Sequence, residues 1–156
     1  MRIFKLLPCL LALLTPLPAN SNSGTETLED IAVGIRARFP RLEMSPFACA
    51  GVTCSKTINF FTFSAFVVVT MGANERPIAI TAVVSDPKDR KLFDSAFGAC
   101  AEAIVSVTAV DMPLDKIPDF VDRVIDALGA DIRYADWTFT SSIALYSGSR
   151  VFHAKR

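Results

Sequence analysis

Cysteine and histidine are the residues of this chain whose chemistry is easiest to assign, because thiolates and imidazoles act as nucleophiles, redox groups and metal ligands. The sequence has four cysteines and one histidine. Cys49 and Cys54 flank a four-residue segment that contains Gly51, and a tight bend there would bring their Cβ atoms within bonding range. We therefore expect a Cys49–Cys54 disulfide. Because the loop that it closes is short, it should raise the free energy of unfolding by only about 2 kcal/mol. The spacing is not Cys-x-x-Cys, so a thioredoxin-like redox site is not indicated.

The other thiol and the histidine support weaker hypotheses. Cys100 falls in the apolar arc of an expected helix, which favours a buried and inert side chain over a reactive thiol. An alternative is a zinc site, whose ligands would be Cys49, Cys54, Cys100 and His153. These residues lack the paired short spacings of zinc sites, and disulfide formation competes with metal binding. We expect neither a metal site nor a cofactor.

Few residues of this sequence could serve as catalytic groups. A Ser-His-Asp or Cys-His arrangement would have to use His153, on an expected strand at the chain end, which is a poor rigid platform for a general base. The sequence contains no Gly-x-Ser-x-Gly elbow, Gly-rich phosphate loop, His-Glu-x-x-His or dinucleotide motif. Its 16 acidic residues make carboxylate pairs unavoidable, so such pairs do not indicate a glycosidase. Whether the protein is an enzyme stays open, and a non-catalytic role is favoured.

A row of aspartates is the most pointed surface feature. An expected helix over residues 114–128 carries Asp115, Asp119, Asp122 and Asp126. Because residues three and four apart share a helix face, the carboxylates form one narrow stripe, here called the acidic stripe. An ordinary solvated helix face accounts for it, and the sharper hypothesis is a docking surface for a basic protein partner. A calcium loop is not indicated.

Residues 1–19 have the pattern of a cleavable secretory signal peptide. Two positive residues precede an apolar run at Leu6–Leu14, and prolines and small residues follow it. We expect cleavage after Ala19 or Ser21, with the end of the peptide between residues 19 and 23. A membrane anchor needs about 20 apolar residues, so we expect no stable membrane insertion of the mature chain.

Export would place the protein in the periplasm or outside the cell, where disulfides form. The sequence has no Asn-x-Ser/Thr sequon, which fits a bacterial envelope protein. Sixteen basic residues balance sixteen acidic ones, and losing Arg2 and Lys5 with the signal peptide leaves 14 against 16, a net charge of −2. A balanced charge gives no strong field for a polyanion, so we expect no nucleic-acid partner.

The length of 156 residues fits one domain, which we place at residues 24–156. A hydrophobic fraction of 51% and a charged fraction of 21% exclude a disordered or fibrous protein. Apolar residues at helical spacing predict helices at about 28–39, 87–107 and 114–128.

β-Branched and aromatic residues dominate the strand-like segments. Lys56–Met71 is expected to form one long strand, or two with a break near Ser64. A turn then leads into a strand at Pro77–Ser85, and the strands on the two sides of this turn predict a hairpin. Trp137–Tyr146 and Arg150–Lys155 are the last expected strands, and short strands flank the Cys49–Cys54 bend.

The resulting order, α-β-β-α-α-β-β, predicts an α+β fold. We expect an antiparallel sheet of about four or five strands, with three helices packed mainly on one face. The leading functional hypothesis is an exported, non-catalytic binding or accessory protein that acts through its surface. One alternative is a small exported hydrolase or thiol enzyme. The other is a carrier of a small apolar ligand between sheet and helices, suggested by the Phe-rich strand.

Overall fold

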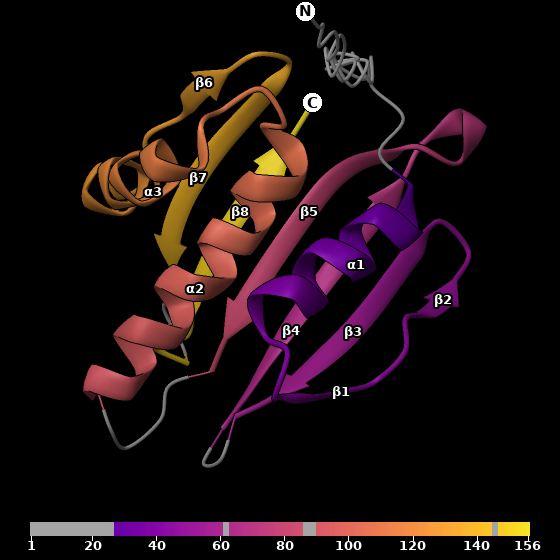
Figure 1. Ribbon diagram of the computed structural model, residues 1–156, viewed down its shortest axis with the longest axis horizontal. Coiled ribbons are helices and arrows are strands. Elements are labelled where there is room, and N and C mark those ends of the chain that lie inside the picture. Colours follow the sequence, from indigo (N-terminus) through magenta and orange to yellow (C-terminus); the bar gives the residue numbers. More distant parts are fainter. Residues whose placement is uncertain (1–26, 61–62, 86–89, 145–146) are drawn as a thin grey trace, which may run out of the picture.

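The computed structural model describes residues 27–60, 63–85, 90–144 and 147–156. In these residues a single antiparallel sheet packs against three α-helices (Figure 1). The fold is therefore α+β, as the sequence predicts. The expected signal peptide at residues 1–19 and the expected first turn of the second helix at 86–89 lie outside the described residues.

The helices are α1 Leu28–Arg38, α2 Arg90–Thr108 and α3 Ile117–Asp126, with short 3-10 turns at Ala73–Glu75 and Leu114–Lys116. The strands are β1 Glu43–Met44, β2 Ala48–Ala50, β3 Thr53–Asn59, β4 Ser64–Met71, β5 Pro77–Val84, β6 Ile132–Tyr134, β7 Trp137–Ile143 and β8 Arg150–Lys155. Their order across the sheet is β1-β3-β4-β5-β8-β7-β6, and β2 also pairs with β3.

The expectation of four or five strands was too low, because the described sheet has eight. The segment 56–71 forms two paired strands with the break at the alternative position near Ser64. β2 and β3 flank the Cys49–Cys54 bend, where strands were expected. β1 and β6 have only two or three residues each, too few to show a period of two in the sequence. These short strands form because a neighbouring strand provides their backbone hydrogen-bond partners, and that pairing depends on the tertiary structure.

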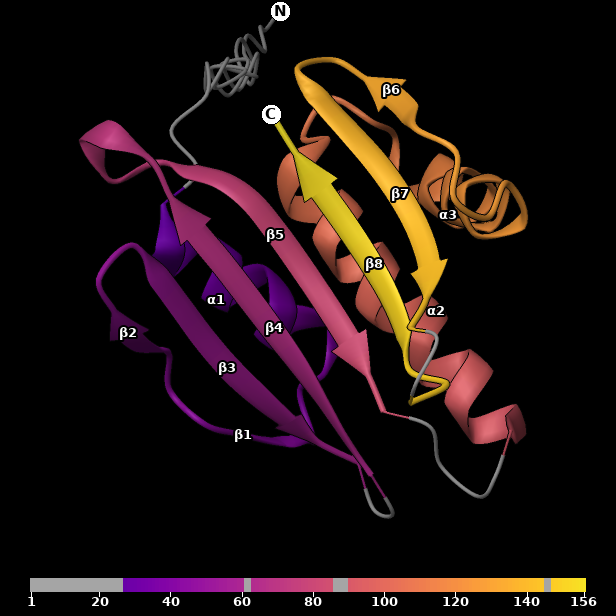
Figure 2. The ribbon, with the colours of Figure 1, turned by 180° about the vertical axis from the view of Figure 1, so that it is seen from behind.

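The three helices lie on the same face of the sheet (Figure 1). α2 packs over β5 and β8, α3 packs over β7, and α1 packs beside α2. In the view from behind, the strands face the reader and no helix of the described residues crosses them (Figure 2). The fold therefore has two layers, a helical layer and a sheet with one uncovered face.

The core lies between these layers and follows strand alternation. In β4, Ala65, Val67 and Val69 are buried beneath the helices, whereas Phe66 and Val68 point to the other face. α2 buries an apolar arc that includes Cys100, as the sequence predicts, whereas Leu92 in its first turn is exposed. The largest fully buried rings are those of Phe97, Phe139 and Phe152.

Local sequence explains where two of the helices begin and end. A reciprocal capping box starts α1: the Asp30 amide donates to the Thr27 hydroxyl at 3.1 Å, and the Thr27 amide donates to the Asp30 carboxylate at 2.8 Å. α3 ends at Asp126, two residues before the predicted Leu128. The chain turns away there because Gly129 adopts a φ of +81° and its amide donates to the Ser141 carbonyl at 2.7 Å.

Across the described residues, no helix combines the length and the apolar content that a bilayer crossing requires.

Candidate functional site

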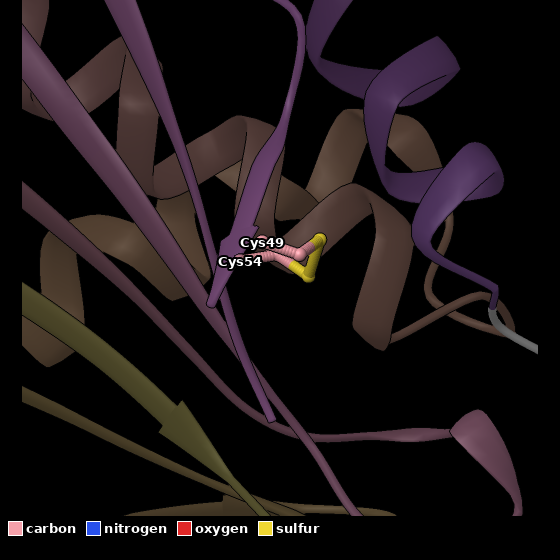
Figure 3. The surroundings of a disulfide bond; sticks show 2 residues. All are labelled: Cys49 and Cys54. Carbon is pink, nitrogen blue, oxygen red and sulfur yellow. A yellow bond between two sulfur atoms is a disulfide. The ribbon is translucent and has the colours of Figure 1, made fainter. Parts of the chain in front are cut away.

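The structure contains the Cys49–Cys54 disulfide that the spacing predicts (Figure 3). The two residues are cross-strand partners in the β2–β3 hairpin, with a Cα–Cα distance of 4.0 Å and an S–S distance of 2.05 Å. Gly51 makes the turn possible because its φ is +60°, a region that favours glycine. The bond ties the short strand β2 to the sheet, so its evident effect is structural.

Cys100 is a free thiol in the described part of the chain, and only 1% of its surface is exposed. Burial raises the pKa of the Cys100 thiol to about 12, which keeps it protonated and unreactive at neutral pH. The zinc hypothesis is not supported by the positions of its ligands. Cys49 and Cys54 are bonded to each other, Cys100 lies in the core, and His153 points to the opposite face of the sheet. No other group of metal-ligating side chains gathers in the described residues.

The four residues of the acidic stripe are all exposed, as the helical spacing predicts. Asp115 lies in the 3-10 turn before α3, 3.9 Å from the ammonium group of Lys116. Two cations lie next to these aspartates: Lys116 in the 3-10 turn and Arg123 in α3. These cations reduce the field of the stripe, so it is a mixed-charge surface rather than a purely acidic one.

In the described part of the chain the helices cover only one side of the sheet, and we call the other side the open face (Figure 2). Alternation along the strands assigns its residues. They are Thr53, Ser55, Thr57 and Asn59 of β3, Ser64, Phe66, Val68 and Thr70 of β4, Ala79, Thr81 and Val83 of β5, Val151, His153 and Lys155 of β8, and Thr138, Thr140 and Ser142 of β7.

The centre of the open face is apolar and almost free of charge. Two cross-strand rows meet there: Phe66, Val83 and Val151 in one, and Val68, Thr81 and His153 in the other. Phe66 is 43% exposed. Of the hydroxyl residues around this centre, Thr57 and Thr140 are half-buried, whereas Ser55 and Ser142 are exposed. Among the residues of β3, β4, β5, β7 and β8 assigned to the open face, Lys155 is the only Asp, Glu, Lys or Arg residue. The other charged residues that the register places on this face, Glu43 of β1 and Arg133 of β6, lie at its two edges.

His153 lies near the middle of this surface, and its Nδ1 atom is 2.7 Å from the hydroxyl oxygen of Thr81. Burial lowers the pKa of the His153 imidazole below its usual 6.5, the Lys155 ammonium lowers it further, and the Asp131 carboxylate opposes both. Asp131 accepts a hydrogen bond of 2.6 Å from the hydroxyl of Thr140, the residue opposite His153 on β7. The imidazole is therefore held neutral over a wider pH range than a free histidine.

This pair is the observation that most favours the hydrolase alternative, but its surroundings do not suit acyl transfer. An oxyanion needs free N–H donors close to the attacking hydroxyl. Thr81 and His153 lie on β5 and β8, which are both paired on their two sides, so their backbone N–H groups are engaged in the ladder. The geometry suits a hydrogen-bonded polar pair within a surface better than a nucleophile and its base.

For the apolar segment Phe60–Val69, the sequence favours a central strand covered on one face by helices, with a membrane or partner surface as the alternative, and it does not locate the open face. The informative feature is that both alternating sets of residues in β4 contain large apolar side chains. A strand covered on one face usually alternates apolar with polar residues, whereas Phe66 and Val68 share a face with Thr70. This irregularity marks apolar residues on the uncovered side.

Comparison of the chain with models of known families, with curated proteins and with solved structures finds no match.

Proposed function

We propose that this chain is an exported, non-catalytic binding protein and that its open face docks a protein partner. The observation that carries the proposal is the apolar, nearly uncharged centre of the open face, which no helix of the described residues covers. Interface centres have the same composition, since charged residues are depleted there. Contiguous apolar surface on a folded protein commonly marks such a contact.

The hydroxyl side chains around the apolar centre fit this role. Threonine and serine present both a methyl or methylene group and a hydroxyl, so they tolerate water in the free protein and form hydrogen bonds with a partner. They come from strands that are held on both sides by the sheet. Such a rigid surface loses little conformational entropy on binding.

Export is supported by two independent features. The N-terminal residues have the charge and hydropathy pattern of a signal peptide. The Cys49–Cys54 disulfide suits a compartment that oxidises thiols. We place the protein in the periplasm or outside the cell, with a bacterial envelope as the favoured setting.

The acidic stripe is a second, weaker candidate surface for a basic partner. Changing Asp115, Asp119, Asp122 and Asp126 to Asn removes four negative charges from exposed positions and leaves the core untouched. If the stripe binds a partner electrostatically, this variant loses the partner and the wild-type complex weakens with added salt. Equal recovery of the same partners by both proteins removes the stripe from consideration.

Site-specific photo-crosslinking in the producing cells tests the open face. A benzophenone side chain at Val68 is expected to give a discrete crosslinked adduct, and Val151→Lys in the same protein is expected to abolish it. Val33 provides the matched control, since it is an exposed valine on α1 in the helical layer. A crosslinker at Val33 should not give the adduct, and Val33→Lys should not disturb the Val68 adduct.

The outcome is read by mass spectrometry of the adduct. A single partner protein crosslinked at Val68 supports the proposal. A second copy of this chain would show that the open face serves self-association instead and would overturn it. No adduct, or equal adducts at Val33 and Val68, would also overturn it. Thermal unfolding of each variant shows that the lysine substitutions leave the fold intact.

A further inference from the structure

A cavity of about 310 Å³ opens between α3 and β6, away from the open face. Met112, Phe120 and Tyr134 form its apolar wall, and Lys116, Asp119 and Arg123 form its rim. The volume is at the lower end of the range for ligand pockets. A mostly apolar hollow with a few charged groups at its edge has the composition of a small-molecule site.

Aromatic packing fixes the wall of this cavity. The rings of Phe120 and Tyr134 are 5.8 Å apart in an edge-on arrangement, and Phe120 also packs edge-on against Phe139 of the core at 5.2 Å. Phe120 and Met112 are buried, whereas Tyr134 is half-buried. The wall is thus anchored in the core and does not have to form when a ligand arrives, which lowers the entropic cost of binding.

The rim carries two cations, Lys116 and Arg123, and the carboxylate of Asp119. Lys116, Asp119 and Arg123 recur every three or four residues, so they line one side of two helical turns. The Arg123 guanidinium stacks 5.1 Å from the centre of the Phe120 ring, and among the described residues it forms no ion pair with a carboxylate. Because Lys116 already faces the Asp115 carboxylate at 3.9 Å, Arg123 is the rim cation that favours a ligand with a negative head group.

We propose that this cavity binds a small amphipathic organic anion, a molecule with an apolar body and a single carboxylate or sulfonate group. The body lies against Phe120, Tyr134 and Met112, and the head group pairs with Arg123 at the rim. Arginine suits this task because its planar guanidinium stacks on the ring while its N–H groups donate to the anion. The site is separate from docking at the open face, because none of its residues belongs to that face; Asp119 is shared with the acidic stripe.

Two fluorescent probes with the same aromatic body separate the roles of wall and rim. Anilinonaphthalene sulfonate carries the negative group, and N-phenylnaphthylamine lacks it. For the native protein we expect the sulfonate to bind more tightly than the neutral probe. Arg123→Gln should weaken sulfonate binding by roughly tenfold, as expected for loss of a charge-assisted hydrogen bond, and should leave the neutral probe nearly unchanged.

Arg133→Gln is the matched control, because Arg133 is an exposed arginine of β6 that does not line the cavity. It removes the same net charge and should leave the affinity for both probes unchanged. Octanoate should displace the bound sulfonate probe, whereas octyltrimethylammonium, with an equally long chain and the opposite charge, should not. Amide chemical shifts on addition of octanoate should change in residues 112–134.

Three results would overturn the inference. The first is an equal loss of sulfonate binding in Arg123→Gln and Arg133→Gln. The second is displacement of the probe by the cation as readily as by octanoate. The third is chemical-shift changes confined to the open face. Because the shifts are recorded on the folded wild-type protein, the result does not depend on the stability of any variant.

Discussion

Thr81 and His153 are 72 residues apart in the sequence, and the Thr81 hydroxyl oxygen lies 2.7 Å from Nδ1 of the His153 ring. They are direct partners across β5 and β8. This contact joins the hairpin of the first half of the chain to the last strand of the sheet. It also places the chain's single titratable imidazole at the centre of the open face.

The half-buried position of His153 predicts a loss of stability in mild acid. Its pKa is lower in the folded protein than the usual 6.5, so the unfolded chain binds a proton more readily. Below pH of about 6.5 this difference stabilises the unfolded state, and the free energy of unfolding falls as the pH drops towards the folded-state pKa. We expect wild type to lose more stability than His153→Gln between about pH 8 and about pH 5.

Urea unfolding of protein without a histidine tag measures this difference. Because the sequence has one histidine, an NMR titration follows a single imidazole and gives its pKa directly. Thr81→Val removes the hydroxyl that contacts the His153 ring but leaves the ring half-buried, so it should change the pKa of the imidazole. Identical pH dependence of wild type and His153→Gln would contradict the prediction.

Removing the Cys49–Cys54 disulfide is expected to lower the free energy of unfolding by about 2 kcal/mol, because the short loop is no longer closed in the unfolded chain. The double substitution Cys49→Ser and Cys54→Ser is compared with wild type under non-reducing conditions.

Intact mass after alkylation provides the thiol count. In the mature protein we expect no labelling when folded and one label after unfolding without reductant, at Cys100. Two or more labels on the folded protein would contradict the bond, and the same spectrum gives the cleavage position.

Gly34 is required for the close approach of α1 to α2. A Cβ added at this position would lie 2.1 Å from a methyl carbon of Val107. Gly34→Ala should therefore destabilise the protein by about 1–3 kcal/mol, although alanine favours a helix over glycine by about 1 kcal/mol.

The combined variant tests this explanation. In a Val107→Ala background the methyl carbon is gone, and we expect Gly34→Ala to become neutral or stabilising. Chemical unfolding of the four proteins gives the coupling energy between the two positions. Additive effects would show that the cost of Gly34→Ala has another origin.

Arg150 links the end of β8 to the first half of α2. Its guanidinium lies 5.5 Å and 5.6 Å from the ring centres of Phe93 and Phe97, and 3.1 Å from a carboxylate oxygen of Asp94. We expect Arg150→Gln to lower the free energy of unfolding by about 1–2 kcal/mol, mainly through the ring contacts, since a half-exposed ion pair contributes less than about 1 kcal/mol. Asp94→Asn should therefore cost less than Arg150→Gln, and the opposite order would assign the effect to the ion pair.

Much of the local structure could be predicted from particular residues. Thr27 and Asp30 have the spacing of a capping box, and the structure forms it. Cys49, Gly51 and Cys54 have the composition of a tight disulfide hairpin. The period of the apolar residues in α2 predicts that Cys100 is buried. In each case the information lies within a few neighbouring residues.

The candidate sites could be predicted only in part. The spacing of the four aspartates correctly places them on an exposed surface, but it does not reveal how far Lys116 and Arg123 offset their charge. The cavity beside α3 combines residues of that helix with Tyr134 of β6, a strand too short to be recognised in the sequence.

The sequence by itself determined the α+β class, the disulfide hairpin, the helices and the alternation of the long strands, because these follow from propensity and periodicity over short distances. Only the tertiary structure decided that the sheet has eight strands in its described part, which face of β4 the helices cover, and that His153 meets Thr81. Such features depend on which distant segments pair, and that choice is made by burying apolar surface across the whole chain rather than by any local pattern.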